Sequence, residues 1–274
     1  MPIKSMAITM LLAVFLTGCH NSLVATETSN DLKPTTTQPI TGPKPDQPIT
    51  VPVLIYHNIR EITPQDSASS QEFIVTPQNF ADQLQYLNEH GFQTILIRNL
   101  PEYFAGQFTL PPKPVIITFD DGKINQYNKA LPLLVKYHFQ ATFFVFANPI
   151  GKSPNYLNWD QLQELQTQGM EIGSHGYYHS YLTKIDNQAL ELEIGGSKKK
   201  LEDNLQVPIV SFAYPFGLYD DRIAEAVKTA GYTTARDIIN GLSHSADDLF
   251  KLKGYFITND FARFKNIVTP ADNN

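Results

Sequence analysis

The sequence predicts an α/β fold in which strands and helices alternate around a parallel sheet. Seven short runs rich in β-branched and aromatic residues carry the strand signal, and helix start and stop signals lie between most of them. The runs are Val51–Tyr56, Pro114–Phe119, Ala141–Phe146, Met170–Ser174, Ile209–Tyr214, Thr233–Arg236 and Leu252–Ile257. Strands that alternate with helices form parallel sheets, but periodicity does not decide whether the sheet is open or closed.

Length and composition set the outer limits of the interpretation. The chain has 274 residues, of which 42% are hydrophobic, enough for one large globular domain with appendages. The formal net charge is -6, so no basic surface indicates nucleic acid as a partner. The chain contains 1 cysteine, which excludes a disulfide within the chain.

The N-terminus predicts a lipoprotein signal peptide over residues 1–18. Lys4 precedes the apolar run 6–16, which is too short to span a bilayer but fits the core of a signal peptide. The segment Leu16-Thr17-Gly18-Cys19 resembles a bacterial lipobox, which implies cleavage before Cys19 and attachment of lipid to its thiol. The alternatives are a plain signal peptide or an uncleaved anchor with an incidental cysteine. We therefore expect an extracytoplasmic protein that is lipid-anchored to the bacterial cell membrane.

Residues 19–50 differ in composition from the rest of the chain. This stretch is rich in Pro, Thr, Ser and Asn and has few apolar residues. Such a segment buries too little apolar surface to fold, so it predicts a flexible tether. Residues 51–274 remain as the catalytic domain, and the tether would hold that domain away from the membrane, near a cell-wall or surface polymer.

Helix boundaries in the folded part are marked by caps and glycines. Thr76 followed by Pro77 predicts a helix start, because threonine caps a helix and proline suits its first turn. Gly91 ends the same helix, since glycine favours the C-terminal cap. Two later helices are predicted on similar grounds over residues 162–168 and 220–230.

Two adjacent carboxylates follow the run Pro114–Phe119, where a buried strand is expected to end. Asp120 and Asp121 precede Gly122, which permits a turn that other residues resist. Side-by-side carboxylates are costly unless a cation or a proton neutralises them. Taken alone, the motif favours an ordinary polar turn over a functional site.

Two histidines follow the run Met170–Ser174 in the same way. His175 and His179 lie four residues apart, and in a helical turn residues at that spacing share one face. Taken alone, they could be solvated surface histidines. Because the C-terminal ends of parallel strands meet on one side of the sheet, we expect both motifs to form one site. One carboxylate and two imidazoles suit a catalytic divalent metal, with the second carboxylate free to act as a base.

These motifs resemble those of the polysaccharide deacetylase (NodB homology) family of metal-dependent carbohydrate esterases. Thr118–Gly122 resembles its first motif, Ser174–His179 its second and Phe212–Gly217 its third. The segment Trp159–Gly169 is also similar to the family, and Val53–His57 is similar to members that act on poly-N-acetylglucosamine. The resemblance implies a distorted, incomplete (β/α) barrel of about seven parallel strands.

The resemblance also implies roles for individual residues. Asp120 would be the general base, and the ligands of one divalent metal, most often Zn²⁺, would be Asp121, His175 and His179. The backbone N–H near Phe216, with Tyr214 beside it, would contact the substrate and its oxyanion.

Three departures from the family pattern concern the proton chemistry. Ala213 stands where the third motif usually carries an arginine that contacts the base, and Phe216 replaces a usual tyrosine. No clear late Leu-His motif supplies a general acid. Because His57 follows a strand-like run directly, we expect it at the same mouth as Asp120, where it would serve as the acid or orient the acid.

The function that follows is metal-dependent removal of N-acetyl groups from an acetylated polysaccharide of the cell envelope or the extracellular space. The polymer would be of the poly-N-acetylglucosamine or peptidoglycan type, and acetate would be released. Two alternatives stay open. One is an esterase that removes O-acetyl groups, for instance from xylan. The other is a non-catalytic, lipid-anchored glycan-binding protein, which the absent arginine and the unidentified acid would explain.

Overall fold

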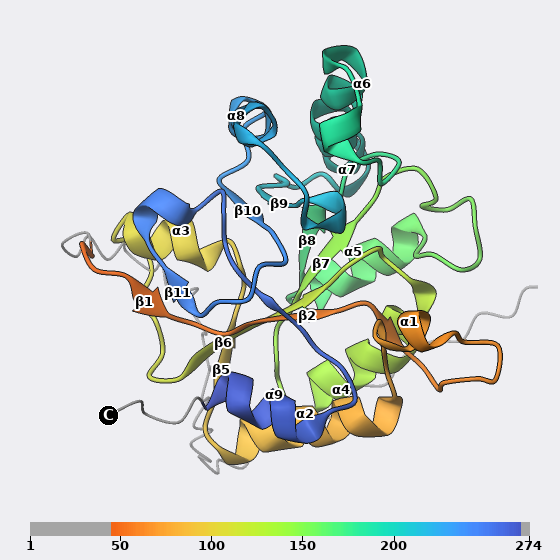
Figure 1. Ribbon diagram of the computed structural model, residues 1–274, viewed down its shortest axis with the longest axis vertical. Coiled ribbons are helices and arrows are strands. Elements are labelled where there is room, and N and C mark those ends of the chain that lie inside the picture. The colour runs from red at the N-terminus through yellow and green to blue at the C-terminus, as the bar shows by residue number, and fades with distance from the viewer. Residues whose placement is uncertain (1–44, 270–274) are drawn as a thin grey trace, which may run out of the picture. The chain divides into compact units, whose positions relative to one another are not determined.

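The computed structural model describes residues 45–269 (Figure 1). The predicted signal peptide, Cys19 and residues 20–44 of the predicted tether lie outside this range. The first element of the described part is the short strand β1 (Ile49–Thr50), which pairs antiparallel with β11 (Ser243–His244), so the last two residues of the predicted tether 19–50 belong to a strand. No helix within residues 45–269 is long and apolar enough to cross a membrane.

The central sheet contains eight strands, and all of its pairings are parallel. Seven of them follow one another across the sheet and correspond to the seven predicted strands. Their order is β10 (Thr234–Arg236), β9 (Ser211–Ala213), β8 (Glu171–Ser174), β7 (Thr142–Val145), β6 (Pro114–Phe119), β2 (Val53–Tyr56) and β12 (Tyr255–Phe256). The sheet curls into the incomplete barrel that the family resemblance implied.

The eighth strand, β5 (Gln93–Ile95), was not predicted. It pairs with the first half of β6, on the edge where β7 pairs with the second half. Gln93 is exposed, Thr94 is half-buried and only Ile95 is buried, so this strand lacks the apolar pattern that marks the others. Two strands thus share one edge of β6, and β7 begins farther along the barrel axis.

A single narrow seam spans the gap between the two outer strands of this incomplete barrel. Leu252 forms an isolated parallel bridge with Arg236 at the end of β10, and the chain then continues into β12, which pairs with β2. The Leu252 N–H donates to the Ala235 carbonyl at 3.0 Å, and the Asp237 N–H donates to the Leu252 carbonyl at 2.9 Å. The seam, residues 252–256, therefore runs from the bridge with β10 into the other outer strand, β12.

Helices cover the outside of this sheet. On one side, α2 (Pro77–Glu89) packs against α4 (Leu131–Lys136) and α9 (Phe261–Val268), as Figure 1 shows. On another, α5 (Trp159–Thr167) packs against α7 (Ser197–Leu205). The remaining helices and short strands are α1 (Ala68–Gln71), α3 (Asn99–Phe104), α6 (Asn187–Glu191), α8 (Asp221–Thr229), β3 (Asn58–Ile59) and β4 (Ile74–Val75).

The helix boundaries follow from local hydrogen bonds. The Thr76 side chain accepts from the Asn79 N–H at the start of α2, as its sequence predicts. The helix predicted over 162–168 begins earlier, at Trp159, because Asn158 and Gln161 form a reciprocal capping box. Two π-helical segments, Gln126–Ala130 before α4 and Leu192–Gly196 between α6 and α7, interrupt otherwise regular helices.

The two faces of the sheet build two apolar clusters. The larger cluster lies between the sheet and the surrounding helices. The smaller cluster joins alternate residues of neighbouring strands, including Val53, Ile116, Phe144 and Ala213, and receives Leu100 from α3. This second cluster fills the barrel interior below the strand ends, so the side chains above it rest on a dry, close-packed floor.

Candidate metal and catalytic site

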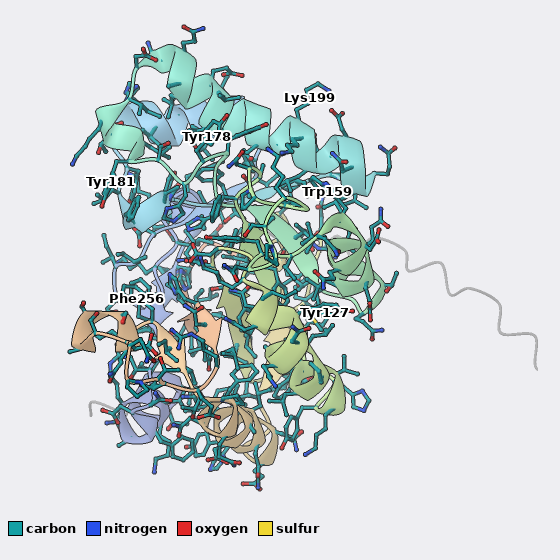
Figure 2. The ribbon with its side chains drawn as sticks, turned by 90° about the vertical axis from the view of Figure 1, so that its right-hand side faces the viewer. Tyr127, Trp159, Tyr178, Tyr181, Lys199 and Phe256 are labelled. Atoms are coloured by element: carbon teal, nitrogen blue, oxygen red, sulfur yellow. The ribbon has the colours of Figure 1, made fainter. Side chains whose placement is uncertain are left out.

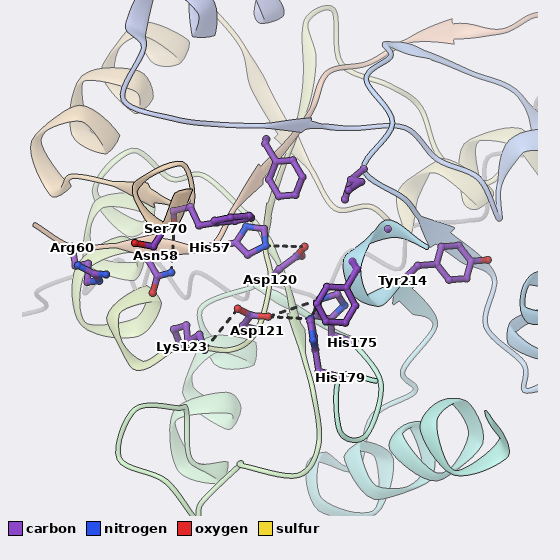
Figure 3. Close-up of a pocket in the computed structure, with 15 residues that line it drawn as sticks. His57, Asn58, Arg60, Ser70, Asp120, Asp121, Lys123, His175, His179 and Tyr214 are labelled. Atoms are coloured by element: carbon purple, nitrogen blue, oxygen red, sulfur yellow. Dashed lines mark hydrogen bonds and ion pairs between the residues drawn. The ribbon is translucent and has the colours of Figure 1, made fainter. Parts of the chain in front are cut away.

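A cavity of about 470 Å³ opens at the C-terminal ends of the strands, where the sequence placed the site (Figure 3). Asp120 and Asp121 reach it from the end of β6, and His175 and His179 from the loop after β8. The remaining lining residues are His57, Asn58, Arg60, Ser70, Phe73, Lys123, Tyr214, Phe216, Gly217, Ile238 and Phe256. Both sequence motifs therefore meet in one pocket.

The predicted metal ligands form one cluster. One ligand atom from each of Asp121, His175 and His179 can be chosen so that all lie within 4.8 Å of one another. The Nε2 atoms of the two histidines are 3.1 Å apart, and Oδ1 of Asp121 lies 3.9 Å from His175 Nε2 and 3.5 Å from His179 Nε2. One carboxylate oxygen and two imidazole nitrogens converge, which is the donor set of a catalytic divalent metal with open positions.

The prediction that His175 and His179 share one face of a helical turn was wrong. Residues 175–180 form no helical turn, so a shared helix face does not bring the rings together. The loop instead reverses through left-handed backbone at Gly176 (φ 84°) and at His179 (φ 63°). A non-glycine residue in that region is strained, and such strain gathers at functional sites.

The carboxylate motif uses the same kind of backbone. Asp121 has φ 77° and Gly122 has φ 70°. A Cβ on Gly122 would lie 2.8 Å from Cγ1 of Val145, so only glycine fits this turn against β7. The turn directs Asp120 and Asp121 to different partners, which separates the predicted base from the predicted ligand.

Neighbouring groups prepare the histidines for binding a metal. His175 Nδ1 lies 2.7 Å from the carbonyl oxygen of Ala213, so the hydrogen on Nδ1 leaves Nε2 free to act as a ligand. Burial and the adjacent His175 lower the pKa of His179 to about 4, with Asp121 acting in the opposite direction. His179 is therefore neutral near pH 7, the form that binds metal.

Asp120 forms a buried ion pair with Arg236, which the sequence reasoning missed. The Arg236 Nη2 atom donates to Oδ1 of Asp120, and both side chains are almost fully buried. Burial raises the pKa of Asp120, but the guanidinium and the nearby His175 and His57 outweigh it and lower the pKa to about 2. Arg236 thus contacts the predicted base although Ala213 stands at the arginine position of the third motif, and the only signal was a charge at the end of the strand-like run Thr233–Arg236.

His57 lies beside Asp120 in the same cavity, as predicted. Its Nε2 atom is 3.8 Å from Oδ2 of Asp120. The ring packs against Phe73 and Phe256, whose centroids each lie 5.1 Å away and which also contact one another at 5.6 Å. Burial lowers the pKa of His57, while Asp120 and Asp121 act to raise it. The two carboxylates therefore favour the protonated form that the surrounding phenyl rings disfavour.

The third motif contributes one of its two predicted residues directly. Phe216 lines the cavity with φ 59°, and its ring lies 4.5 Å from the His179 ring and stacks on Tyr181 at 3.9 Å. Tyr214 also lines the cavity, but its hydroxyl donates to the Phe250 carbonyl at 3.0 Å, outside the ligand cluster. Figure 3 shows this hydroxyl turned away from Asp121, His175 and His179.

A lysine that the sequence reasoning did not consider also lies at the mouth. Lys123 Nζ is 3.8 Å from Oδ2 of Asp121, on the side opposite the histidines. It donates to the Tyr156 hydroxyl at 2.7 Å and lies 4.1 Å from the centroid of that ring. Oδ1 of Asp121 therefore faces the histidines while Oδ2 faces a cation.

Comparisons with known proteins identify the same region. The family model for polysaccharide deacetylases matches residues 108–235. The protein YxkH of Bacillus subtilis is 30% identical over 186 residues, which span 66% of this chain and 62% of YxkH. A poly-beta-1,6-N-acetyl-D-glucosamine N-deacetylase of Staphylococcus epidermidis is 27% identical over 242 residues, 80% of this chain and 82% of that one.

A solved structure extends the likeness to three dimensions. The Streptococcus pyogenes deacetylase PplD, in complex with acetate, superposes with a TM-score of 0.75 and 26% sequence identity. The superposition covers 81% of this chain and 100% of that chain. The shared fold includes the curled sheet whose strand ends carry the Asp and His motifs.

Proposed function

Because the chain belongs to the polysaccharide deacetylase family, we propose that it is a metal-dependent hydrolase that removes N-acetyl groups from a polysaccharide and releases acetate. The polymer would be a cell-envelope or extracellular glycan of the poly-N-acetylglucosamine or peptidoglycan type. One observation carries the proposal. A three-residue ligand cluster and a separate ionised carboxylate, Asp120, face the same cavity.

The residues present fit a divalent metal, since Asp121, His175 and His179 offer three ligand atoms and a cavity in front of them. When bound, such an ion polarises a carbonyl oxygen and lowers the pKa of a water. Asp120 accepts a proton from the attacking water, and Arg236 keeps that carboxylate ionised and oriented. The Phe216 backbone N–H donates to the oxygen that becomes negative as water adds.

Departure of the amine needs a proton, because an amide anion is a poor leaving group. His57 is the remaining imidazole in the cavity, 3.8 Å from Asp120 and clear of the ligand cluster. It is therefore placed to receive the proton taken by Asp120 and deliver it to the leaving nitrogen. Phe73 and Phe256 pack against this ring and shield part of it from water.

The proposed function is tested by acetate release from β-1,6- and β-1,4-linked N-acetylglucosamine oligomers and from peptidoglycan. We expect release from at least one of these substrates, loss of release after treatment with a chelator, and recovery after addition of Zn²⁺. An O-acetylated xylan serves as the comparison for the esterase alternative. Chelator-resistant release, or release from xylan alone, would refute the proposal.

Replacing His57 tests the assignment of the acid. His57→Gln should bind metal like the wild type but lose most acetate release from N-acetyl substrates. An activated O-acetyl ester should be affected much less, since its leaving group needs little protonation. The two substrates are assayed side by side by acetate release. Equal losses on both would assign His57 to positioning rather than to proton transfer.

We also propose that the protein is lipid-anchored outside the cytoplasm, on the strength of the segment Leu16–Cys19. Cys19→Ala should prevent lipid attachment, so the variant should accumulate as precursor or escape to the medium. Membrane fractionation and intact mass report the outcome. A membrane-bound variant whose mass differs from wild type only by the substituted side chain would show that the motif is incidental.

A further inference from the structure

Glu193 is a buried acidic residue that lies outside the cavity. It belongs to the π-helical segment Leu192–Gly196 and is only 2% exposed. Among residues 45–269, no lysine, arginine or histidine lies within ion-pair distance of its carboxylate. A buried carboxylate without a cationic partner costs considerable free energy, so its hydrogen bonds must offset that cost.

Every one of those hydrogen bonds goes to the loop that carries the two histidine ligands. Oε2 of Glu193 accepts from the Tyr177 N–H at 2.7 Å and from the Tyr178 N–H at 3.0 Å. Oε1 accepts from the Ser180 hydroxyl at 2.6 Å and, more weakly, from the Tyr178 N–H at 3.2 Å. Both carboxylate oxygens are therefore used to gather backbone and side-chain donors between His175 and the residue after His179.

The packing of the loop depends on the same carboxylate. A Cβ on Gly176 would lie 2.7 Å from Oε2 of Glu193, so only glycine lets the loop lie this close. On its other side, the loop is held by the Ala147 N–H, which donates to the Gly176 carbonyl at 3.0 Å. The Tyr178 side chain, by contrast, lies outward and is 53% exposed (Figure 2). The loop is thus fixed through its backbone, between Glu193 and the end of β7.

We propose that Glu193 is a positioning residue that holds His175 and His179 at the spacing a metal requires, without touching the metal. Its bonds immobilise the two residues just before the strained His179, whose left-handed backbone would otherwise relax to a lower-energy conformation. The inference rests on the proposed function in one respect, namely that the ligand cluster holds a divalent metal. It adds a determinant of metal affinity that lies in a different helical segment, behind the ligands.

The test is a titration of the full-length chain and its variants with Zn²⁺, followed by the visible absorption spectrum of the Co²⁺ form. Glu193→Ala should weaken Zn²⁺ binding by on the order of tenfold or more, as replacement of outer-shell partners does, and should change the Co²⁺ spectrum. Glu193→Gln should restore most of the affinity, because its oxygen accepts from both N–H groups while its amide donates to the Ser180 oxygen. Glu191→Gln, an exposed change on the adjoining helix, should leave affinity and spectrum unchanged.

The outcomes separate this inference from the proposed function. If the wild-type chain binds no Zn²⁺ or Co²⁺, the metal-dependent function is refuted. If the wild type binds and Glu193→Ala binds equally well with an unchanged Co²⁺ spectrum, the role of Glu193 is overturned and the function stands. Should Glu193→Ala fail to fold, Ser180→Ala removes one of the bonds and leaves the carboxylate in place. That variant should bind Zn²⁺ more weakly with an altered Co²⁺ spectrum, and unchanged values would overturn the inference.

Discussion

Asp120→Asn should reduce acetate release by roughly a hundredfold or more, the scale expected when a general base is lost. The amide has no basic oxygen to take a proton from water, but it keeps an acceptor for the Arg236 guanidinium. Metal binding should stay close to the wild-type value, because the ligand atoms belong to Asp121, His175 and His179. Steady-state acetate release and a Zn²⁺ titration measure the two properties independently.

Two further variants show whether the two aspartates have separate roles. Asp121→Asn should act mainly through metal affinity, so that added Zn²⁺ recovers part of its activity. Asp247→Asn, an exposed change on a surface turn, should leave both properties unchanged. Equal, mild losses in the Asp120 and Asp121 variants would contradict the assignment and favour a glycan-binding protein without turnover.

Arg236→Met should have the largest effect on stability, about 3–5 kcal/mol of unfolding free energy. The substitution leaves Asp120 as a buried anion without its cation, and it removes a guanidinium that lies 5.1 Å from the Phe144 ring in the barrel interior. Urea unfolding at fixed metal concentration measures the loss. Lys228→Met, at an exposed lysine on α8 whose side chain forms no hydrogen bond or ion pair within residues 45–269, is the control, with an expected change of about 1 kcal/mol or less.

A double variant identifies the origin of that loss. In Asp120→Asn with Arg236→Met, both charges are absent, so much of the stability should return. The single Arg236→Met variant should also lose activity at a higher pH than wild type. Its base must be ionised, and without the guanidinium burial raises the pKa of Asp120, so protonation on acidification begins earlier. An unchanged acid limb and a double variant no more stable than the single one would show that the pair is not coupled.

The sequence predicted the strands best where burial and backbone pattern coincide. Val115, Ile117 and Phe119 belong to a strand buried on both faces, so an apolar run marks it without ambiguity. β5 was not predicted, because its pairing with β6 depends on its place in the sheet and is not marked by the residue types of Gln93 or Thr94. A long apolar run predicts a buried strand, whereas a short strand at a shared edge forms only because the neighbouring strand offers hydrogen-bond partners.

The site was predicted to the extent that it lies at strand ends. Asp120, Asp121 and His175 come directly after strands, and parallel topology brings strand ends together. The conformation of the histidine loop could not be predicted, because the left-handed backbone of His179 leaves no mark on residue type. Arg236 is 116 residues from Asp120, and only the three-dimensional ring of strands makes them neighbours.

Arg236 also bears on the glycan-binding alternative. That alternative drew on the alanine that replaces the family arginine in the third motif. The Arg236 guanidinium contacts Asp120 instead, from β10, the strand next to the one that carries Ala213. The Ala213 carbonyl meanwhile orients His175, so this position takes part in the site through its backbone. The departure in sequence is therefore no sign of a decayed site.

The seam between the two outer strands, residues 252–256, supplies one part of the site, and a much earlier stretch of the chain supplies the other. The predicted metal ligands lie at residue 121 and within residues 175–179. The surroundings of Asp120 depend on the seam, which forms the bridge with Arg236 and brings Phe256 against His57. His179, the last of the predicted ligands, precedes Leu252, the first residue of the seam, by more than seventy residues, so the ribosome adds the ligands first. During synthesis, the chain therefore contains all three predicted metal ligands before it contains the residues that surround Asp120. Proteolytic removal of residues from 252 onward would instead take away the surroundings of Asp120 while all three predicted ligands stay in the chain.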